Sequence, residues 1–489
     1  MDSGPRRISK SAFKDGKRCP KRLWFRWNAP DLATSDEAML ARAALGHEIG
    51  QLARGLNPGG VESAGDTTAL RLESTRSLLA GGAETIYEAA FEADGLYAQV
   101  DILYRGRSGW VIREVKSAKS VNDQHVTDSA FQLMVLERSG LSVERVEIVT
   151  VALDAPAIAS SRIQDLFAVQ DVTGPARGES IELFDQVREL RAIIEDGRAE
   201  AVEPGRHCDS ACPFYSHCFA ALPDDDLLFA PNLSKGKYEE LRAAGYRRMS
   251  ELPDSLVLSP NAEHVRQVLA SGQVPWVDAG LAKAVSGMKF PLVFLDFETA
   301  SPLFPVNPGM RGGELVVFQF SAHVLSGPGG PLAHYEHIDL ESPDPHPGVV
   351  AALAPVFSGA GSILHYSPFE KRCLNRLVAA GVEGANGLLG QFLRSAVDME
   401  GFFKGPVYHP AMRGKTSIKV VLPALVPDLD YSDLEIKSGG MAEMSYIEAR
   451  TGKLAGDELN RRREALLRYC ERDTEAMVRL FNRIWELCR

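Results

Sequence analysis

Residues 109–120 read GWVIREVKSAKS. The first part of this stretch is rich in bulky apolar and β-branched residues and follows a glycine, which predicts a β-strand over 109–116. Side chains two positions apart on a strand point to the same face, so Glu114 and Lys116 project together. The preceding run LYAQVDIL, at 96–103, carries Asp101 on the neighbouring strand, where it can approach Glu114 across a hairpin.

These three side chains suit metal-assisted hydrolysis. Two carboxylates can hold a divalent cation through oxygen ligands. A nearby lysine can orient the attacking water or help to deprotonate it, and Mg²⁺ or Mn²⁺ would stabilise the charge that develops on a phosphodiester. Alternating charges on an exposed strand are the other interpretation of E-V-K.

The surrounding segments predict a mixed α/β core. Strand patterns occur at 85–91, 97–104 and 145–153 in addition to 109–116, and helical patterns occur at 35–56, 124–139 and 181–196. A helix between the last two strands is typical of a crossover connection.

The order of these residues resembles that of the PD-(D/E)XK nucleases, because Asp101, Glu114 and Lys116 match D-x12-E-x-K. His47 in LGHEIGQLA and Gln132 in DSAFQLMVLE are similar to the histidine and glutamine of the RecB-type branch. The resemblance implies a restriction-endonuclease-like domain over 1–222, with metal ligands His47, Asp101 and Glu114 and catalytic residues Lys116 and Gln132. Leu136 stands where that branch often has a tyrosine.

Four of the seven cysteines form a second pattern. Cys208, Cys212 and Cys218 are spaced C-x3-C-x5-C, and Cys19 lies far upstream. Clustered thiols in a reducing compartment suggest a metal before a disulfide. The set resembles the iron–sulfur staple of AddB-type nucleases and CRISPR-adaptation exonucleases, whose first gap is usually two residues. It implies a [4Fe–4S] cluster that ties the ends of the domain together, with structural zinc as the alternative.

The C-terminal half carries another set of acids. VFLDFET (293–299) is a predicted buried strand with Asp296 and Glu298 on one face. LLRYCERDTEAMVRLF (466–481) is a predicted amphipathic helix on which Tyr469 and Asp473, four apart, share a face. Glu370 follows an apolar strand, so acids from several elements could converge on a pair of metal ions.

This arrangement resembles the DnaQ-like exonucleases with Y-x3-D in their last motif, and SIKVVLPAL (417–425) resembles a helix start of that fold. The resemblance implies an RNase H-like domain over 289–489 that cleaves 3′→5′. Asp296, Glu298 and Asp473 would bind metal, and Tyr469 would position the attacking water. The middle motif differs from the family pattern, since Glu370 stands where the family usually has an aspartate that binds metal. Asp398 is a second candidate for this metal ligand.

Residues 223–288 predict short helices between the two domains. Residues 233–252 are weakly similar to a helix–hairpin–helix element, and a plain helical spacer is the alternative. The expected fold class is therefore α/β, with two mixed-sheet nuclease domains, restriction-endonuclease-like and then RNase H-like, joined by a short helical segment.

Composition is consistent with a soluble protein. No apolar run reaches about 18 residues and the N-terminus is polar, so we expect a cytoplasmic protein without membrane contact. The net charge is −11, but residues 1–26 hold nine basic and two acidic residues. Trp24, Phe25 and Trp27 lie among them, which suits phosphate contact with base stacking or, alternatively, a solvated basic helix with its aromatics in the core.

Together the two resemblances predict a metal-dependent DNA nuclease, acting on single-stranded DNA or free ends in repair or in defence against foreign DNA. Two alternatives remain open. One is a nucleic-acid-binding or assembly protein with an inactive nuclease domain. The other is an RNA exonuclease.

Overall fold

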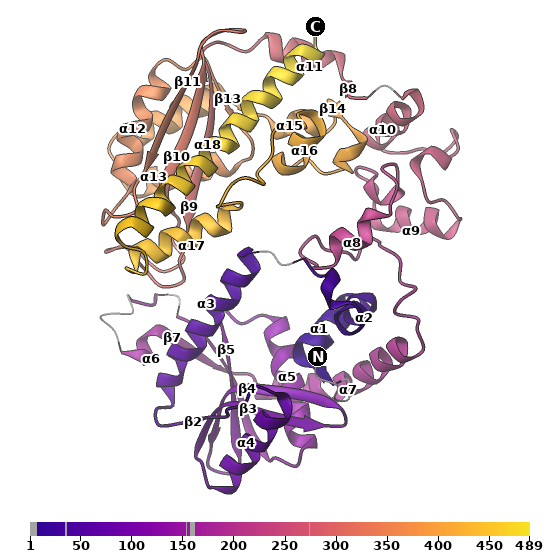
Figure 1. Cartoon of the computed structure of the whole chain (residues 1–489), viewed down its shortest axis with the longest axis vertical. Coiled ribbons are helices and arrows are strands. Elements are labelled where there is room, and N and C mark those ends of the chain that lie inside the picture. Colours follow the sequence, from indigo (N-terminus) through magenta and orange to yellow (C-terminus); the bar gives the residue numbers. More distant parts are fainter. Residues whose placement is uncertain (1–6, 35–36, 153, 157–161, 273) are drawn as a thin grey trace. The chain divides into compact units, whose positions relative to one another are not determined.

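The computed structural model describes residues 7–34, 37–152, 154–156, 162–272 and 274–489. The chain divides into two compact units. The first comprises residues 1–221 with 303–305 and 311–313, and the second comprises 222–302, 306–310 and 314–489. Each unit contains a sheet with both parallel and antiparallel strands, covered by helices (Figure 1), so the predicted α/β class is confirmed.

The first unit is built on a seven-stranded sheet of order β2-β3-β4-β5-β6-β7, with β1 beside β4. Its strands are β1 (Ile8–Ser9), β2 (Val61–Glu62), β3 (Thr85–Ala93), β4 (Leu96–Arg105), β5 (Trp110–Lys116), β6 (Val143–Val151) and β7 (Phe167–Asp171). The β4–β5 pair is antiparallel and the β5–β6 pair is parallel. All four predicted strands are present; residue 153, the end of the last prediction, lies outside the described residues.

The helices of the first unit are α1 (Lys10–Arg18), α2 (Pro20–Asn28), α3 (Glu37–Ala53), α4 (Thr68–Ala80), α5 (Asp123–Arg138), α6 (Ile163–Leu166), α7 (Thr173–Glu195) and α8 (Tyr215–Ala220). The predicted helix 35–56 corresponds to α3 and a 3-10 turn, and residues 35–36 lie outside the described residues. Helix α7 begins before the predicted start at 181, because its first turns contain Gly174, Pro175 and Gly178, which disfavour helix in a sequence pattern.

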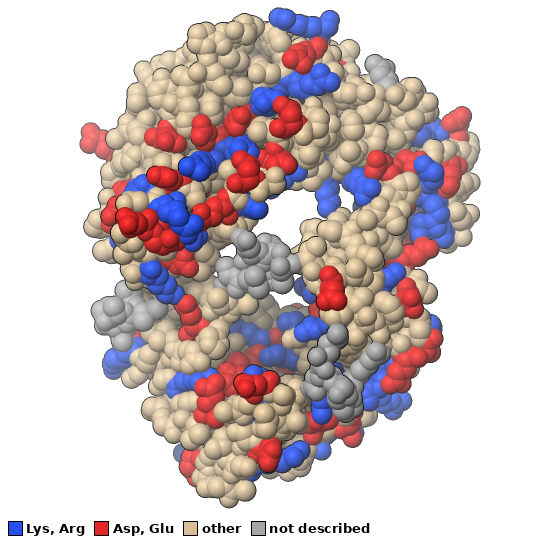
Figure 2. All heavy atoms as spheres, viewed as in Figure 1, with Lys and Arg blue, Asp and Glu red and all other residues tan. Residues whose placement is uncertain are grey.

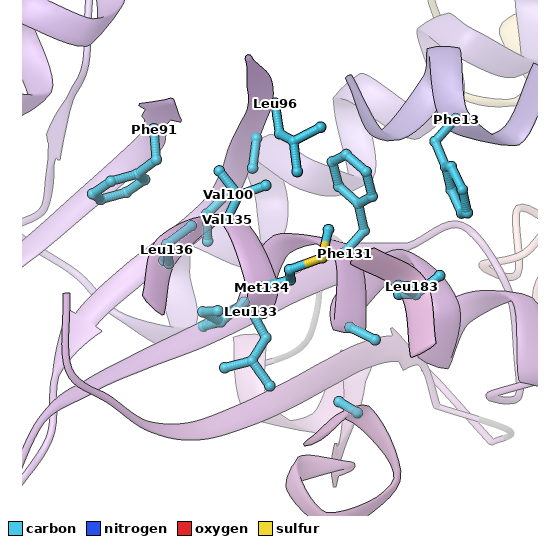
Figure 3. Close-up of a cluster of buried hydrophobic side chains, with 14 of the residues drawn as sticks. Phe13, Phe91, Leu96, Val100, Phe131, Leu133, Met134, Val135, Leu136 and Leu183 are labelled. Carbon is cyan, nitrogen blue, oxygen red and sulfur yellow. The ribbon is translucent and has the colours of Figure 1, made fainter. Parts of the chain in front are cut away.

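Helix α5 is the crossover between the parallel strands β5 and β6, and its apolar face forms the centre of the core. Phe131 and Leu133 are fully buried there (Figure 3). The ring of Phe13, from α1, stacks on Phe131 with centroids 5.6 Å apart. This packing fixes α1 and α5 against the sheet, and both helices carry charged residues near the carboxylates of β4 and β5.

The second unit contains a sheet of order β11-β10-β9-β12-β13. The strands are β9 (Leu292–Ala300), β10 (Val316–Leu325), β11 (Leu332–Ile338), β12 (Ser362–His365) and β13 (Ala396–Asp398). Strands β9, β10 and β11 are antiparallel neighbours, whereas β12 runs parallel to β9 and β13 parallel to β12.

Helices cover both faces of this sheet. They are α12 (His346–Ser358), α13 (Phe369–Ala379), α14 (Ala385–Ser395), α15 (Glu400–Phe403), α16 (Ile418–Leu425), α17 (Gly439–Arg450) and α18 (Gly456–Leu487). The 32-residue α18 crosses β9 and β10 (Figure 1), and its buried Phe481 contacts Phe294 of β9. Within the described ranges, no helix has the length and apolar character needed to span a membrane.

Residues 223–288, predicted as a separate helical segment, belong to the second unit. They form α9 (Lys235–Ala243), α10 (Pro260–Ser271), α11 (Ala279–Ser286) and the short strand β8 (Trp276–Val277). Strand β8 pairs with β14 (Val407–Tyr408), which joins the segment to the rest of the unit. Gly245 does make a turn with positive φ, but a 3-10 helix follows it and the next α-helix starts only at Pro260.

Candidate active sites

Site 1, defined here as Asp101, Glu114, Lys116 and Gln132, forms on β4, β5 and α5. The antiparallel register pairs Ile102 with Arg113, so the preceding Asp101 lies opposite Glu114, as the sequence predicts. The Oδ2 atom of Asp101 accepts a hydrogen bond from the backbone N–H of Val115 at 2.7 Å. Glu114 is only 2% exposed, so its charge needs partners within the protein.

Those partners include both residues predicted to assist catalysis. Lys116 Nζ donates to Glu114 Oε1 at 2.9 Å and to Asp128 Oδ2 at 2.5 Å. Gln132 Nε2 donates to Glu114 Oε2 at 2.5 Å and to the backbone oxygen of Gln99 at 2.8 Å. The structure therefore brings Asp101, Glu114, Lys116 and Gln132 together from three elements.

Two further lysines, which the sequence analysis did not assign to the site, reach it from α1. Lys10 Nζ contacts Glu114 Oε1, and Lys14 Nζ lies 3.3 Å from Asp128 Oδ2. Lysines four residues apart share one face of a helix, and Asp128 lies one turn before Gln132 on α5. This periodicity is visible in the sequence, but it identifies a site only once α1 is known to pack beside α5.

His47, the other predicted metal ligand, comes from α3, which packs against β5. It is exposed, with its Nε2 atom 3.5 Å from Gln51 Nε2. Within the described residues, no hydrogen bond or ion pair joins His47 to Asp101 or Glu114.

The aromatic residues of the basic N-terminal segment are largely used in packing. Phe25 is 5% exposed and stacks on Phe214, with ring centroids 5.1 Å apart. Trp24 and Trp27 pack against the hydrophobic core of the first unit. Of the two interpretations of this segment, the structure favours a basic helix pair whose aromatic side chains serve the core.

The charged groups of site 1 shift one another's pKa values. Burial and the neighbouring charge of Glu114 raise the pKa of Asp101 to about 7. Burial alone would also raise the pKa of Glu114, but Lys10 and Lys116 outweigh it and lower that pKa. Burial opposes the charge of Lys116, yet Glu114 and Asp128 raise its pKa above the usual range. Lys116 is therefore protonated at neutral pH and suited to orienting a water or phosphate oxygen, not to accepting a proton.

Site 2, defined as Asp296, Glu298, Glu370 and Asp473, lies on the second sheet and on α13 and α18. Asp296 and Glu298 are two apart on β9, and their ligand atoms, with Cys470 Sγ, lie within 4.8 Å of one another. Cys470 Sγ is 3.6 Å from Asp296 Oδ2. Asp473, three residues further along α18, raises the pKa values of both β9 acids through its charge.

Two polar side chains contact Asp473 and Tyr469. Tyr431 donates its hydroxyl to Asp473 Oδ1 at 2.6 Å, and Lys419 Nζ lies 3.3 Å from the Tyr469 hydroxyl. The Lys419 ammonium also lies 5.1 Å from the ring centroid of Tyr431. Lys419 is on α16, whose N-cap is Ser417, in the segment that resembles the DnaQ-like helix start. Tyr431 was not predicted, because it lies in an irregular loop without a periodic pattern.

The two candidates for the third acid differ in position. Glu370 is 2% exposed at the start of α13, and its charge raises the pKa of Asp296. Its Oε2 atom lies 3.7 Å from His365 Nδ1. Asp398 is exposed, and its Oδ1 accepts the backbone N–H of Glu400 at 2.9 Å. The geometry thus favours Glu370 as the third acid, while Asp398 binds the backbone at the start of α15.

The carboxyl groups of site 2 repel one another in a buried setting. Burial, followed by the charges of Asp473, Glu298 and Glu370, raises the pKa of Asp296 well above its usual range. Burial and Asp473 raise the pKa of Glu298 to about 8, although Lys419 lowers it. A divalent cation would remove this repulsion, so the negative charges of site 2 favour the binding of such a cation.

This gives a pH-dependent prediction. The pKa of Glu298 is higher in the folded protein than in the unfolded chain, so the folded state binds more protons and its stability falls as pH rises from about 5 to 8. Mn²⁺ must displace those protons, and each one displaced is worth about 1.4 kcal/mol per pH unit. Thermal unfolding scans should therefore show a larger Mn²⁺ stabilisation at pH 8 than at pH 6. Glu298→Gln should reduce the difference between the Mn²⁺ stabilisation at pH 8 and that at pH 6. If this difference is the same in Glu298→Gln as in the parent, the prediction is wrong.

The four predicted cluster cysteines share one pocket. Cys19, Cys208, Cys212 and Cys218 all line a cavity of about 40 Å³, together with aromatic residues such as Phe25 and Phe214. Burial, and then the charges of neighbouring thiols, raise the pKa of Cys208 and of Cys218. Thiolates in this pocket therefore favour a bound metal as their counter-charge.

The spacing of the thiols bears on which metal fits. Tetrahedral Zn–S bonds of about 2.3 Å would place the sulfur atoms about 3.8 Å apart. Among the described residues, no three of these cysteines have sulfur atoms within 4.8 Å of one another. On a cubane cluster each thiolate binds a different iron, so the sulfurs lie farther apart. The four cysteines line one pocket and so suit a metal held by all of them, for which a [4Fe–4S] cluster and zinc are the two candidates.

Residues 293–417 match a family described as a domain of unknown function (DUF2779). The match begins in β9 and ends at the N-cap of α16, so it includes Asp296, Glu298, Glu370 and Asp398. It does not reach Tyr469 or Asp473. No curated protein matches the chain.

Proposed function

We propose that this protein is a metal-dependent nuclease, with a RecB-like PD-(D/E)XK centre at site 1 and a DnaQ-like exonuclease centre at site 2. The observation that carries the proposal is the convergence of four acids from β9, α13 and α18, where burial and then the neighbouring carboxylates raise the pKa values of Asp296 and Glu298. Buried carboxylates of this density are costly unless a cation joins them.

At site 2, Asp296, Glu298, Asp473 and Glu370 would hold Mg²⁺ or Mn²⁺, which supplies an activated water and stabilises the charge on the phosphate. The Tyr469 hydroxyl is suited to positioning the attacking water, since burial raises its pKa and keeps it protonated. Lys419, 3.3 Å from that hydroxyl, orients it and offers a positive charge to a phosphate oxygen.

At site 1, Asp101 and Glu114 would bind the cation while Lys116 orients the water or phosphate. Gln132 holds Glu114 through its 2.5 Å hydrogen bond and fixes the direction of that carboxylate. A cluster on Cys19, Cys208, Cys212 and Cys218 would join α2 to the segment after α7, which stabilises the domain without taking part in hydrolysis. The substrate we propose is DNA that is single-stranded or has free ends.

One observation favours a second candidate function for the first unit. Lys10 and Lys116 both contact Glu114 Oε1, so the two ammonium groups already neutralise the carboxylate that a metal would need. In this alternative, site 1 is inert and the first unit binds nucleic acid or assembles with a partner, while site 2 alone hydrolyses.

Digestion of end-labelled single-stranded DNA and RNA by the full chain tests the proposal, with Mn²⁺, with Mg²⁺ and with excess chelator. We expect metal-dependent shortening of DNA from the 3′ end by site 2, with cleavage lost in chelator. If the protein prefers RNA, the proposed substrate changes to RNA and the proposed metal-dependent hydrolysis stays the same. Absence of metal-dependent cleavage of both polymers would overturn it.

A further inference from the structure

A second cluster of metal-ligating side chains lies in the second unit, outside site 2. His323 on β10, His334 on β11 and Glu471 on α18 each offer one ligand atom, and these atoms lie within 4.8 Å of one another. The two imidazole rings lie 4.5 Å apart between centroids with an interplanar angle of 27°. His323 is 6% exposed, whereas the side chains of His334 and Glu471 are 23% and 46% exposed.

The hydrogen bonds around the histidines determine which ring nitrogens are free. The Thr474 hydroxyl donates its single proton to the backbone oxygen of Glu471 at 3.0 Å. Its oxygen therefore accepts from both of its other neighbours, His323 Nδ1 at 2.8 Å and Ser321 Oγ at 2.8 Å. Ser321 has then used its own proton, so its oxygen must accept from His334 Nε2, which is 2.9 Å away.

In this assignment, the one in which all four contacts are hydrogen bonds, His323 carries its proton on Nδ1 and His334 carries its proton on Nε2. The lone pairs of His323 Nε2 and His334 Nδ1 are consequently left for another ligand. His334 Nδ1 lies 3.6 Å from the Glu471 carboxylate, so two acceptors face each other, and a ring nitrogen of His323 belongs to the same group of ligand atoms within 4.8 Å. One proton can join only one such pair, whereas a metal ion can join all three atoms.

We propose that His323 Nε2, His334 Nδ1 and the Glu471 carboxylate bind a transition-metal ion of the Zn²⁺ class. Two imidazoles and one carboxylate form a ligand set suited to zinc, whereas Mg²⁺ prefers oxygen ligands alone. The hydroxyls of Ser321 and Thr474 hold the second nitrogen of each ring, which is the outer-shell support that metal-binding histidines usually have. Burial keeps His323 neutral by lowering its pKa to about 4.

The proposed site has room for a fourth ligand. His323 and Glu471 line a pocket of about 580 Å³ on the side of α18 that also carries Glu464, Arg468 and Glu475. Figure 2 shows acidic and basic side chains interspersed over the exposed surface of this region. A water or a small anionic group could enter here, so the ion need not be purely structural. Its three residues are not among the ligands of site 2, so the proposal does not depend on nuclease activity.

The test measures Zn²⁺ and Co²⁺ binding to chelator-treated full-length protein in excess Mg²⁺, which occupies the carboxylate sites. His334→Gln and Glu471→Gln are the test variants, and both positions are partly exposed, which limits the risk of misfolding. His337→Gln, on the same strand but stacked on Phe320, is the matched control. Metal content and the visible Co²⁺ spectrum are recorded, because cysteine-bound Co²⁺ gives strong thiolate charge-transfer bands that nitrogen and oxygen ligands do not.

The parent and His337→Gln should bind one equivalent without thiolate bands. Both test variants should bind that equivalent at least about 100-fold more weakly, since even loss of an outer-shell partner costs about 10- to 100-fold. If His334→Gln fails to fold, Glu471→Gln decides alone. Equal stoichiometry and affinity in the parent and Glu471→Gln would overturn the proposal and leave the cluster as a His–Glu ion pair.

Discussion

In a chain whose site 1 is disabled by Lys116→Met, Asp296→Asn is expected to lower the remaining metal-dependent hydrolysis rate by about 10³-fold or more. Asp296 is the acid on which the charges of Asp473, Glu298 and Glu370 all act, so it lies at the centre of site 2. Replacing it removes a metal ligand and one negative charge together. A loss of about 4 kcal/mol of transition-state stabilisation corresponds to this factor.

Two further variants in the same background separate the candidates for the third acid. Glu370→Gln should also slow hydrolysis, by about 10- to 100-fold, because Glu370 is buried beside Asp296. Asp398→Asn is the matched control and should change the rate by less than about threefold, since it retains the Oδ1 acceptor that binds the backbone N–H of Glu400. Initial rates on a 3′-labelled oligonucleotide give all three values. A slow Asp398→Asn protein with a normal Glu370→Gln protein would reverse the assignment.

Cys208→Ser is expected to remove the proposed iron–sulfur cluster and to destabilise the first unit strongly. Cys19 and Cys208 come from distant parts of the chain but line the same pocket, so a cluster held by both joins these segments. Because the cluster's binding energy contributes to folding, losing it should lower the corresponding thermal transition by on the order of 10 °C. Visible absorbance, iron content and calorimetry after anaerobic purification measure both effects.

Cys488→Ser is the appropriate control, because Cys488 follows α18 in the second unit and does not line this pocket. It should keep its iron and its transition temperature. If the parent protein contains stoichiometric zinc and no iron, the four cysteines form a zinc site and not an iron–sulfur cluster. Iron in the Cys208→Ser protein at the parental level would show that these thiols are not its ligands.

The sequence predicted the parts of the fold that have a strong local pattern. Strands β3 to β6 and helix α5 follow from period-two and helical spacing, and the two-residue spacing of Glu114 and Lys116 predicts their shared face. The opposition of Asp101 and Glu114 also follows, because a hairpin of this length sets the register. The shared face of Tyr469 and Asp473 on α18 was predicted from their four-residue spacing on a helix.

Other site residues depend on tertiary packing that no local pattern specifies. Lys10 reaches Glu114 only because α1 packs beside α5 through Phe13 and Phe131. Tyr431 reaches Asp473 from an irregular loop. The pairing of His323 with His334 depends on the β10–β11 register, which pairs them directly opposite each other, and neither histidine belongs to a motif. His47 was predicted by resemblance alone, and it has no hydrogen bond or ion pair with Asp101 or Glu114 among the described residues.

The central claim is that the chain contains two separate hydrolytic centres. One comparison tests it most directly: digestion of the same end-labelled single-stranded DNA, with Mn²⁺, by the parent, Lys116→Met, Asp296→Asn and the double variant, after each is shown to unfold like the parent. We expect each single variant to keep part of the activity and the double variant to have none. A double variant that degrades DNA like the parent would contradict the account, and a single variant that is already inactive would reduce the two centres to one.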